Sequence, residues 1–508
     1  MKKTRIIISL ILASAMLLLA SCSDGYNGIA PADGYNYSYY SKAGIEAVTA
    51  DPAVPDEPNN NDPEAKQIIE NPFVKTSENA VSTFSADVDT ASYTLMRRLI
   101  KNDYNLKELK STAGVSIRTE ELINYFKYDH VRPQTGELFG VSAKLVNCPW
   151  NENTALLILG LRTEVPENRA DNNLVFLIDI SGSMNSSDKL PLLQKTFSYL
   201  TSNLTENDTV SIVTYAAGEA IVLEGCAGNK AEMIQSAINK LRASGSTNGE
   251  AGLKKAYELA EKYYKPEGNN RIILASDGDL NVGMSSVDEI KEYVAEKRGQ
   301  GVYISVLGFG YGNYRDSMME TIADHGNGVY YYIDGEEEAE KIFGDDLLST
   351  LYTVAKDVKL QITFDADSVA EYRLIGYENR VMAAEDFDND TKDAGELGAG
   401  HSVTVCYELK LNETVDKLFY LAVRYKAPDG EKSSLNEYTM TEAMIKAEAD
   451  ADTDLVAALC ELGMILHDSE FAQELTLDNV LALLEGHDYS SDSYKQQFKD
   501  LMKQLRAK

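Results

Sequence analysis

The central part of the chain, residues 171–355, alternates between two hydrophobic patterns. Short, mainly apolar runs predict strands that are buried on both faces, at 174–178, 210–215, 272–275, 302–307 and 329–333. Between these runs, apolar residues recur at steps of three and four, which predicts helices, the last of them over 336–352. Because strands alternate with helices, we predict an α/β domain with a doubly wound, mainly parallel sheet.

The segments on either side of this domain, 71–165 and 356–430, have the pattern of β-rich flanks. Strands are expected at 139–147 and 155–162, then at 357–364, 371–377, 402–411 and 418–426. Neither flank makes a complete sheet, so we expect both to pair across the inserted domain into one β-sandwich. Leucines with helical spacing predict a helical region at 440–508. Its apolar stripes would form core against the sandwich or, alternatively, a groove for a partner.

The N-terminus has the pattern of a bacterial export signal. Three basic residues precede an apolar stretch, 6–20, that is too short to cross a bilayer comfortably. It ends in Leu-Ala-Ser-Cys, which resembles a lipobox, so we expect residues 1–21 to be a lipoprotein signal peptide and Cys22 to be acylated. The alternative is a simple secretory signal with an incidental cysteine. We therefore expect a lipid-anchored, extracytoplasmic protein of the cell membrane or outer membrane.

A flexible tether is expected at 22–70. This segment is rich in proline, asparagine and glycine and has no apolar periodicity, which is typical of an extended, solvated spacer. Its tyrosines could instead form a binding patch.

Net charge excludes one class of function. The 508 residues carry 80 acidic against 48 basic side chains, a formal charge of −32. A nucleic-acid binder needs a basic face, and an anionic bilayer would repel such a chain, so membrane attachment depends on the lipid.

Five cysteines are too few for a disulfide scaffold. We expect four of them to be packing residues, with 148–406 the first pair to inspect for a disulfide: Cys148, Cys226, Cys406 and Cys460.

Five residues with hard oxygen donors follow predicted strands or lie in a glycine-rich loop of the central domain: Asp179, Ser181, Ser183, Thr247 and Asp277. Ligands of doubly wound sheets bind outside the carboxyl ends of the strands, so we expect these side chains to converge. Carboxylate and hydroxyl oxygens suit Mg²⁺, Mn²⁺ or Ca²⁺ rather than zinc.

The Asp-x-Ser-x-Ser motif at 179–183, together with Thr247 and Asp277, resembles the metal-ion-dependent adhesion site of von Willebrand factor A domains. Five further segments extend the resemblance: 81–93, 123–126, 148–150, 307–310 and 373–380. Over roughly residues 70–505 the chain is similar to bacterial YfbK-type von Willebrand A lipoproteins.

The resemblance implies an octahedral divalent cation, Mg²⁺ first and Mn²⁺ or Ca²⁺ as alternatives. Ser181, Ser183 and Thr247 would ligate the cation or hold water, and Asp179 and Asp277 would act directly or through water. An open position would accept an Asp or Glu carboxylate from a protein ligand, in adhesion, assembly or signalling. We expect no enzyme, because no nucleophile or general base is evident beside the site. A metal-dependent envelope hydrolase and a structural or chaperone-like assembly partner remain alternatives.

Two further expectations concern the surroundings of this site. Asp87 and Asp89 would share one face of a strand, which makes them a candidate second cation site, unless they serve local capping and hydrogen bonding. The resemblance also implies that the helix over 336–352 slides when the ligation of the cation changes.

Overall fold

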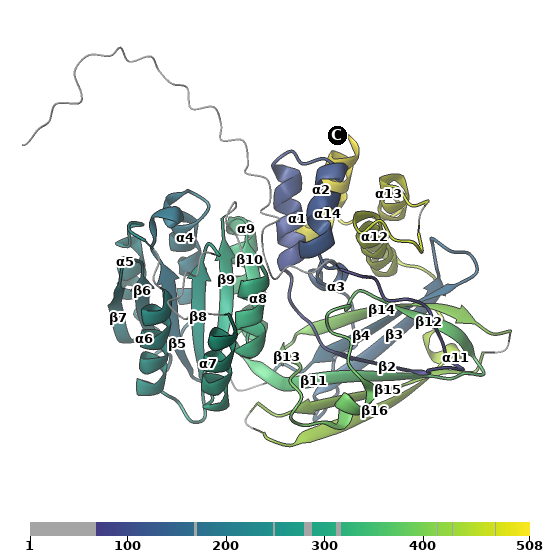
Figure 1. Cartoon of the computed structure of the whole chain (residues 1–508), viewed down its shortest axis with the longest axis horizontal. Helices are drawn as coiled ribbons and strands as arrows, with labels where there is room; N and C mark the ends of the chain where they lie inside the picture. Colours follow the sequence, from purple (N-terminus) through teal and green to yellow (C-terminus); the bar gives the residue numbers. More distant parts are fainter. Residues whose placement is uncertain are drawn as a thin grey trace, which may run out of the picture. The chain divides into compact units, whose positions relative to one another are not determined.

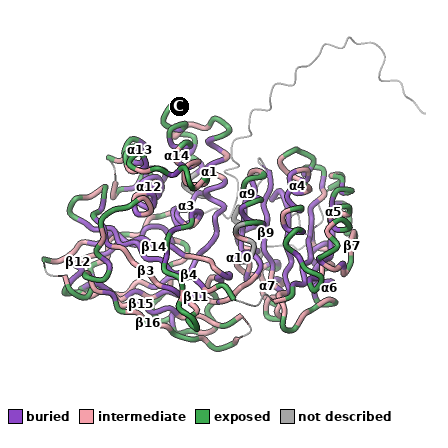
Figure 2. Tube along the Cα trace, turned by 180° about the vertical axis from the view of Figure 1, so that it is seen from behind, coloured by how far each residue is buried: buried purple, intermediate pink, exposed green. Residues whose placement is uncertain are grey.

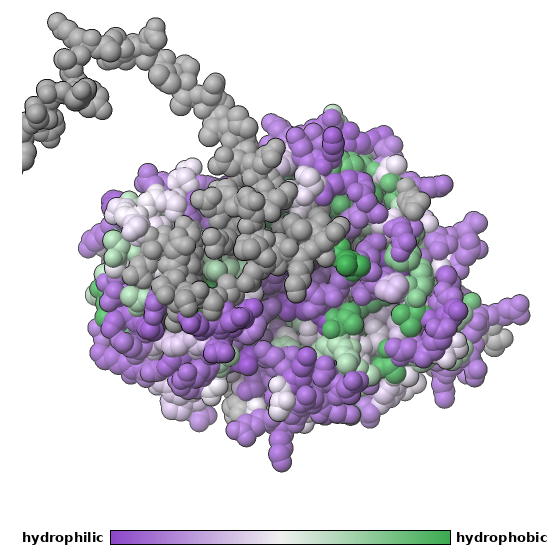
Figure 3. Space-filling model, in the orientation of Figure 1, coloured by the Kyte–Doolittle hydropathy of each residue, from purple (hydrophilic) through white to green (hydrophobic). Residues whose placement is uncertain are grey.

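The computed structural model describes residues 68–166, 170–246, 249–278, 287–310, 316–413, 415–428, 430–472 and 474–508. The expected signal peptide, Cys22, nearly all of the expected tether and Thr247 lie outside the described residues. No helix within these ranges has the length and apolarity that a membrane span requires. The face drawn in Figure 3 is mainly hydrophilic, with hydrophobic residues in small groups.

A six-stranded sheet forms the centre of the von Willebrand A-like part, as the pattern predicts (Figure 1). Its strand order is β10 (Tyr330–Ile333), β9 (Tyr303–Phe309), β8 (Asn269–Ser276), β5 (Asn172–Asp179), β6 (Thr209–Tyr215) and β7 (Glu219–Ala227). All neighbours are parallel except β6 and β7. Because the chain adds strands on both sides of β5, the ends of β5 and β8 form a topological switch point.

Two layers of helices cover this sheet. Side chains at Leu174, Phe176 and Ile178 share a core with one layer, α4 (Leu190–Thr201), α5 (Ala231–Asn239) and α9 (Glu336–Glu340). Side chains at Val175 and Leu177 share a core with the other, α6 (Gly249–Lys262), α7 (Val287–Gly299) and α8 (Asp316–His325). Alternate residues of β5 therefore face opposite layers, which explains its continuous apolar run.

The segment 336–352 is helical over nearly its whole length, as expected, but it is not one regular α-helix. Helix α9 ends at Glu340, a π-helical turn covers Lys341–Asp345, and α10 (Leu347–Leu351) follows. The backbone N–H of Asp346 donates to the carbonyl of Lys341 at 2.8 Å, and the Lys341 ammonium group binds the Asp346 carboxylate at 2.6 Å. These two contacts hold the wider turn, which takes one more residue than an α-helical turn.

Strands from both flanks make each sheet of a sandwich, so the expected pairing across the inserted part is confirmed. The first sheet has the order β1 (Val74–Lys75), β12 (Val369–Ile375), β14 (Ser402–Leu411), β4 (Ala155–Thr163) and β3 (Phe139–Asn147). The second has β13 (Gly395–Gly398), β11 (Thr353–Phe364), β15 (Lys417–Lys426) and β16 (Ser433–Thr441), with β2 (Val81–Ser85) on β11. Leu159 and Leu360, one from each sheet, belong to the same buried core.

A group of helices from both ends of the described chain shares a second core on the outer face of the first sheet (Figure 2). It comprises α1 (Ala91–Lys101), α2 (Leu106–Ser116), α3 (Thr119–Asn124), α12 (Ala451–Leu466), α13 (Leu477–Glu485) and α14 (Ser493–Arg506). The leucine stripes of α12 and α14 are buried there, so their expected role as core is confirmed. Two short helices lie outside this group: η3 (Ala384–Asp388) lies between β12 and β13, and α11 (Glu442–Ile445) lies between β16 and α12.

The four cysteines of the described residues are buried and free, which confirms that they are packing residues. The considered pair Cys148–Cys406 is wrong. Strand β4 lies between β3 and β14, so the strand neighbour of Cys406 on this side is Ile158. The pKa of the Cys460 thiol is raised mainly by burial and, to a lesser extent, by its contact with Cys406.

Candidate functional site

The expected metal-binding residues come from two adjacent strand ends. Asp179 is the last residue of β5, and Asp277 directly follows β8. The register of these parallel strands pairs Ile178 with Ala275, so the two acidic residues leave the sheet at the same edge. After Asp179 the chain turns into a short 3₁₀ helix, η1 (Gly182–Asn185), which carries Ser183.

Hydrogen bonds hold the hydroxyl and carboxylate groups of the site together. Oδ1 of Asp179 accepts the backbone N–H of Ser181 at 2.7 Å, and Oδ2 accepts the Ser276 hydroxyl at 3.4 Å. The hydroxyls of Ser181 and Ser183 lie 2.9 Å apart. Both carboxylates and Ser181 are buried whereas Ser183 is exposed, so the residues extend from the sheet edge to the surface.

The glycine-rich loop that precedes α6 is bonded to the same turn. The Ser244 N–H donates to the Ile180 carbonyl at 2.7 Å, and the Gly182 N–H donates to the Gly245 carbonyl at 3.0 Å. Gly245 has a φ of +85°, a conformation that glycine adopts at no steric cost. The structure thus brings Asp179, Ser181, Ser183 and Asp277 together, while Thr247, two residues beyond Gly245, stays a prediction.

The electrostatics of the site suit a hard cation. Burial raises the pKa of the Asp179 carboxyl to about 6, hydrogen bonds from Ser181 hold back the rise, and the Asp277 carboxylate adds to it. Oδ1 of Asp277 is buried and has no hydrogen-bond partner among the residues that the structure describes. No group of three or more His, Cys, Asp or Glu side chains in the described part of the chain could hold a metal. A site of two carboxylates and hydroxyls, with one free carboxylate oxygen, fits Mg²⁺ or a similar ion.

Lys189 belongs to this site, although the sequence patterns did not reveal it. Its ammonium group donates to Oδ2 of Asp277 at 2.8 Å. One signal was present, because Lys189 directly precedes a predicted helix, where the helix dipole disfavours a cation. Ser276, whose hydroxyl supports Asp179, was also not singled out.

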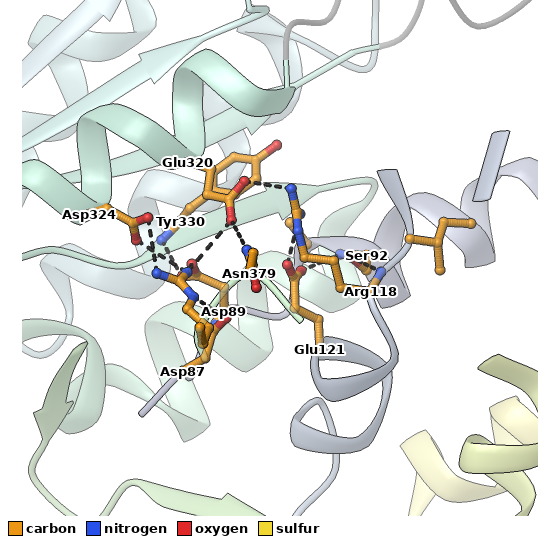
Figure 4. Close-up of polar contacts among 12 residues, drawn as sticks. Asp87, Asp89, Ser92, Arg118, Glu121, Glu320, Asp324, Tyr330 and Asn379 are labelled. Carbon is orange, nitrogen blue, oxygen red and sulfur yellow. Dashed lines mark hydrogen bonds and ion pairs between the residues drawn. The ribbon is translucent and has the colours of Figure 1, made fainter. Parts of the chain in front are cut away.

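Asp87 and Asp89 do not form the considered second cation site. They lie in the loop after β2, not on a strand, and Asp89 accepts the backbone N–H of Tyr330 at 2.9 Å. The Arg380 guanidinium binds Asp87 at 2.9 Å and Asp324 at 3.1 Å, and lies 3.5 Å from Asp89. Figure 4 shows Asp87 and Asp89, which precede the central sheet in the sequence, beside Asp324 of α8 and Tyr330 of β10. A guanidinium of the chain itself therefore lies between these carboxylates, where a bound cation would have to sit.

Three sequence families match the chain. The von Willebrand factor type A domain family matches residues 173–345, and a family described as "von Willebrand factor" matches 59–158. A third, described as "Uncharacterized protein YfbK, C-terminal", matches 349–418 and 410–507.

The chain is also similar to individual proteins. The chain is 39% identical over 435 residues to "Uncharacterized protein YfbK" of Escherichia coli (strain K12), which covers 80% of this chain and 74% of that protein. It is 25% identical over 305 residues to inter-alpha-trypsin inhibitor heavy chain H3 of Mus musculus, covering 58% of this chain and 30% of that one. A solved von Willebrand factor type A protein from Catenulispora acidiphila is 15% identical with a TM-score of 0.43, covering 74% of this chain and 91% of that chain. On the similarity to the Escherichia coli protein, the chain belongs to the YfbK family of proteins with a von Willebrand factor type A domain.

Proposed function

We propose that this protein is an envelope lipoprotein that binds a protein ligand through a divalent cation at the carboxyl ends of β5 and β8. One observation carries the proposal: Oδ1 of Asp277 is buried beside Asp179, and none of the described residues forms a hydrogen bond with it. Such an oxygen is costly in a protein interior unless something binds it. A hard cation would satisfy it and would reduce the repulsion between the two carboxylates.

The residues of the site would have different roles in binding the cation. Asp179 and Asp277 would supply negative charge, and the hydroxyls of Ser181 and Ser183 would supply neutral oxygens. The Ser181 N–H orients the Asp179 carboxylate, because it occupies Oδ1. The bound cation, with Mg²⁺ favoured, would offer a coordination position to an exposed Asp or Glu of the ligand. In a chain with a charge of −32, such a cation would be a strong local attraction for an acidic group.

Membrane attachment completes the proposal. Acylation of Cys22 would anchor the chain outside the cytoplasm, at the cell membrane or the outer membrane, and residues 22–70 would hold the binding site away from the bilayer. The support is the sequence pattern of this segment.

Calorimetric titration with MgCl₂ and MnCl₂ tests the cation site directly. The wild-type protein should bind one divalent cation at the site, and Asp179→Asn should weaken this binding at least tenfold, because it removes a charge and keeps the shape. Ser198→Ala is the matched control, since Ser198 is exposed on α4 and its hydroxyl donates to the carbonyl of Lys195 in the same helix. Unchanged binding by Asp179→Asn would contradict the proposal.

Capture of ligand tests the second half. Immobilised protein should retain an envelope protein from extract in MgCl₂ but not in EDTA, and Asp179→Asn should retain none. Equal retention in EDTA would show that ligand binding does not use the cation.

A further inference from the structure

Lys189 forms a buried ion pair inside the proposed cation site. Its ammonium group lies 2.8 Å from Oδ2 of Asp277, and the side chains of Lys189 and Asp277 are 12% and 2% exposed. The other oxygen of the same carboxylate, Oδ1, has no hydrogen-bond partner within the described part of the chain. One oxygen of the Asp277 carboxylate is therefore paired with the Lys189 ammonium group. The other is left for a bound cation.

The surroundings of Lys189 are shaped to hold it there. The aliphatic stem passes over Gly310, the residue after β9, where a Cβ atom would lie 2.0 Å from Cε of Lys189. Lys189 also stands at the N-terminus of α4, where the helix dipole opposes a positive charge. A lysine in this place needs a compensating contact, and Asp277 provides it.

The residue beside Lys189 is fixed from outside the central sheet. Arg98 of α1 binds the carboxylate of Asp188 and donates to the hydroxyl of Tyr332 at 2.9 Å. The Tyr332 hydroxyl in turn donates to the carbonyl of Gly310. These contacts limit how far the segment 188–189 and Gly310, which lies against the Lys189 side chain, can move apart.

We propose that Lys189 sets the affinity of the site for divalent cations, by holding Oδ2 of Asp277 and placing a positive charge next to the bound ion. The inference rests on the proposed function, since it concerns the same site. A positive charge bonded to Oδ2 of Asp277 would repel a divalent ion bound at the same carboxylate, in a partly buried setting. It also takes up part of the negative charge of Asp277 that the ion would otherwise meet. The site thereby binds divalent cations more weakly than its carboxylates alone would.

Mn²⁺ binding, followed by electron paramagnetic resonance of the free ion and by calorimetry, tests this role on the full-length protein. Lys189→Met keeps the stem and removes the charge, and should bind Mn²⁺ about tenfold more tightly, which corresponds to about 1.4 kcal/mol. Lys189→Arg keeps the charge and should show no such increase. Lys195→Met, on the same helix but with an exposed side chain paired to Glu336, is the matched control and should equal wild type.

The outcomes separate this inference from the proposed function. Equal or weaker Mn²⁺ binding by Lys189→Met than by wild type overturns the role of Lys189 and leaves the cation site standing. Binding by Lys189→Met but not by wild type supports the inference and overturns the proposed function. Absence of binding in both proteins overturns both. If Lys189→Met does not fold, Lys189→Gln replaces it, with the same expected increase.

Discussion

Arg380 joins four acidic residues at the contact between the sandwich region and the helical layer of the central sheet. Its guanidinium lies 2.9 Å from Asp87, 3.1 Å from Asp324, 3.5 Å from Asp89 and 3.6 Å from Glu320. The side chain is 13% exposed, and three of its partners are 10% exposed or less. Replacing it by methionine removes the charge and keeps an aliphatic chain of similar reach.

The loss should be large because the partners stay buried. Removing one member of a buried ion pair costs about 3–5 kcal/mol, against about 0–1 kcal/mol for an exposed pair. We therefore expect Arg380→Met to lower the free energy of unfolding by about 4 kcal/mol at pH 8. The loss should be smaller at pH 5.5. Burial raises the pKa of Asp89 and raises that of Glu320 to about 8, and Arg380 holds both down, so without it these carboxyls take up protons and lose their unpaired charge.

Urea unfolding followed by circular dichroism at both pH values measures this difference from the shift in midpoint. Lys446→Met is the control, because its ion pair with Glu442 at 2.7 Å leaves the lysine side chain 72% exposed. A loss below about 1 kcal/mol at pH 8, or an equal loss at both pH values, would refute the assignment of Arg380 as the charge that stabilises this cluster.

Two further substitutions test the second core, on the outer face of the first sheet. Burial raises the pKa of Glu461 to about 8, so the folded chain binds more protons there than the unfolded chain between pH 4.5 and 8. Its contribution to stability is complete below pH 4.5 and is lost as pH rises towards 8. Between pH 4.5 and 8 this group lowers the free energy of unfolding by up to about 1.4 kcal/mol per pH unit, and Glu461→Gln should remove that slope. Urea unfolding at pH 6 and pH 8 measures it, and an equal fall in the free energy of unfolding in the variant and the wild type would contradict the prediction. Leu459→Ala, at a fully buried position of α12, should cost about 2–5 kcal/mol in the same assay. Met444→Ala, at a position 66% exposed, should change stability by less than about 0.5 kcal/mol, and similar losses for both would contradict the packing described.

Strands and helices with one regular buried face were predictable from the sequence. The bounds of β3 and β14 are those expected, 139–147 and 402–411, because their apolar positions repeat clearly along the strand. Strand β16 was missed because it is a mostly exposed edge strand whose polar side chains carry no hydrophobic pattern. The break between α9 and α10 was missed because it depends on how Lys341 meets Asp346 in the folded chain.

The candidate site was predictable to the same extent. Asp179 and Asp277 could be placed together because the carboxyl ends of adjacent parallel strands meet at one edge. Lys189 and Ser276 could not be ranked above other polar residues, because their roles depend on where each side chain points. For Asp87 and Asp89 the structure bears out the alternative of local hydrogen bonding, since Oδ1 of Asp87 accepts the N–H of Asp89. The sequence could not decide between this and a second cation site, because Arg380, which binds Asp87, is almost 300 residues away in the sequence.

By itself the sequence determined the periodicity of the elements, the succession of strands and helices along the central domain and the motif at the edge of its sheet. These depend on neighbours within a few residues, and so a local pattern records them. The tertiary structure alone decided which charges are neutralised. Arg380 binds the acidic pair that resembled a second cation site, and Lys189 shares Asp277 at the first. Ion pairs between distant residues follow from packing. A buried charge without a partner costs free energy, so it is stable only where the fold places an opposite charge beside it.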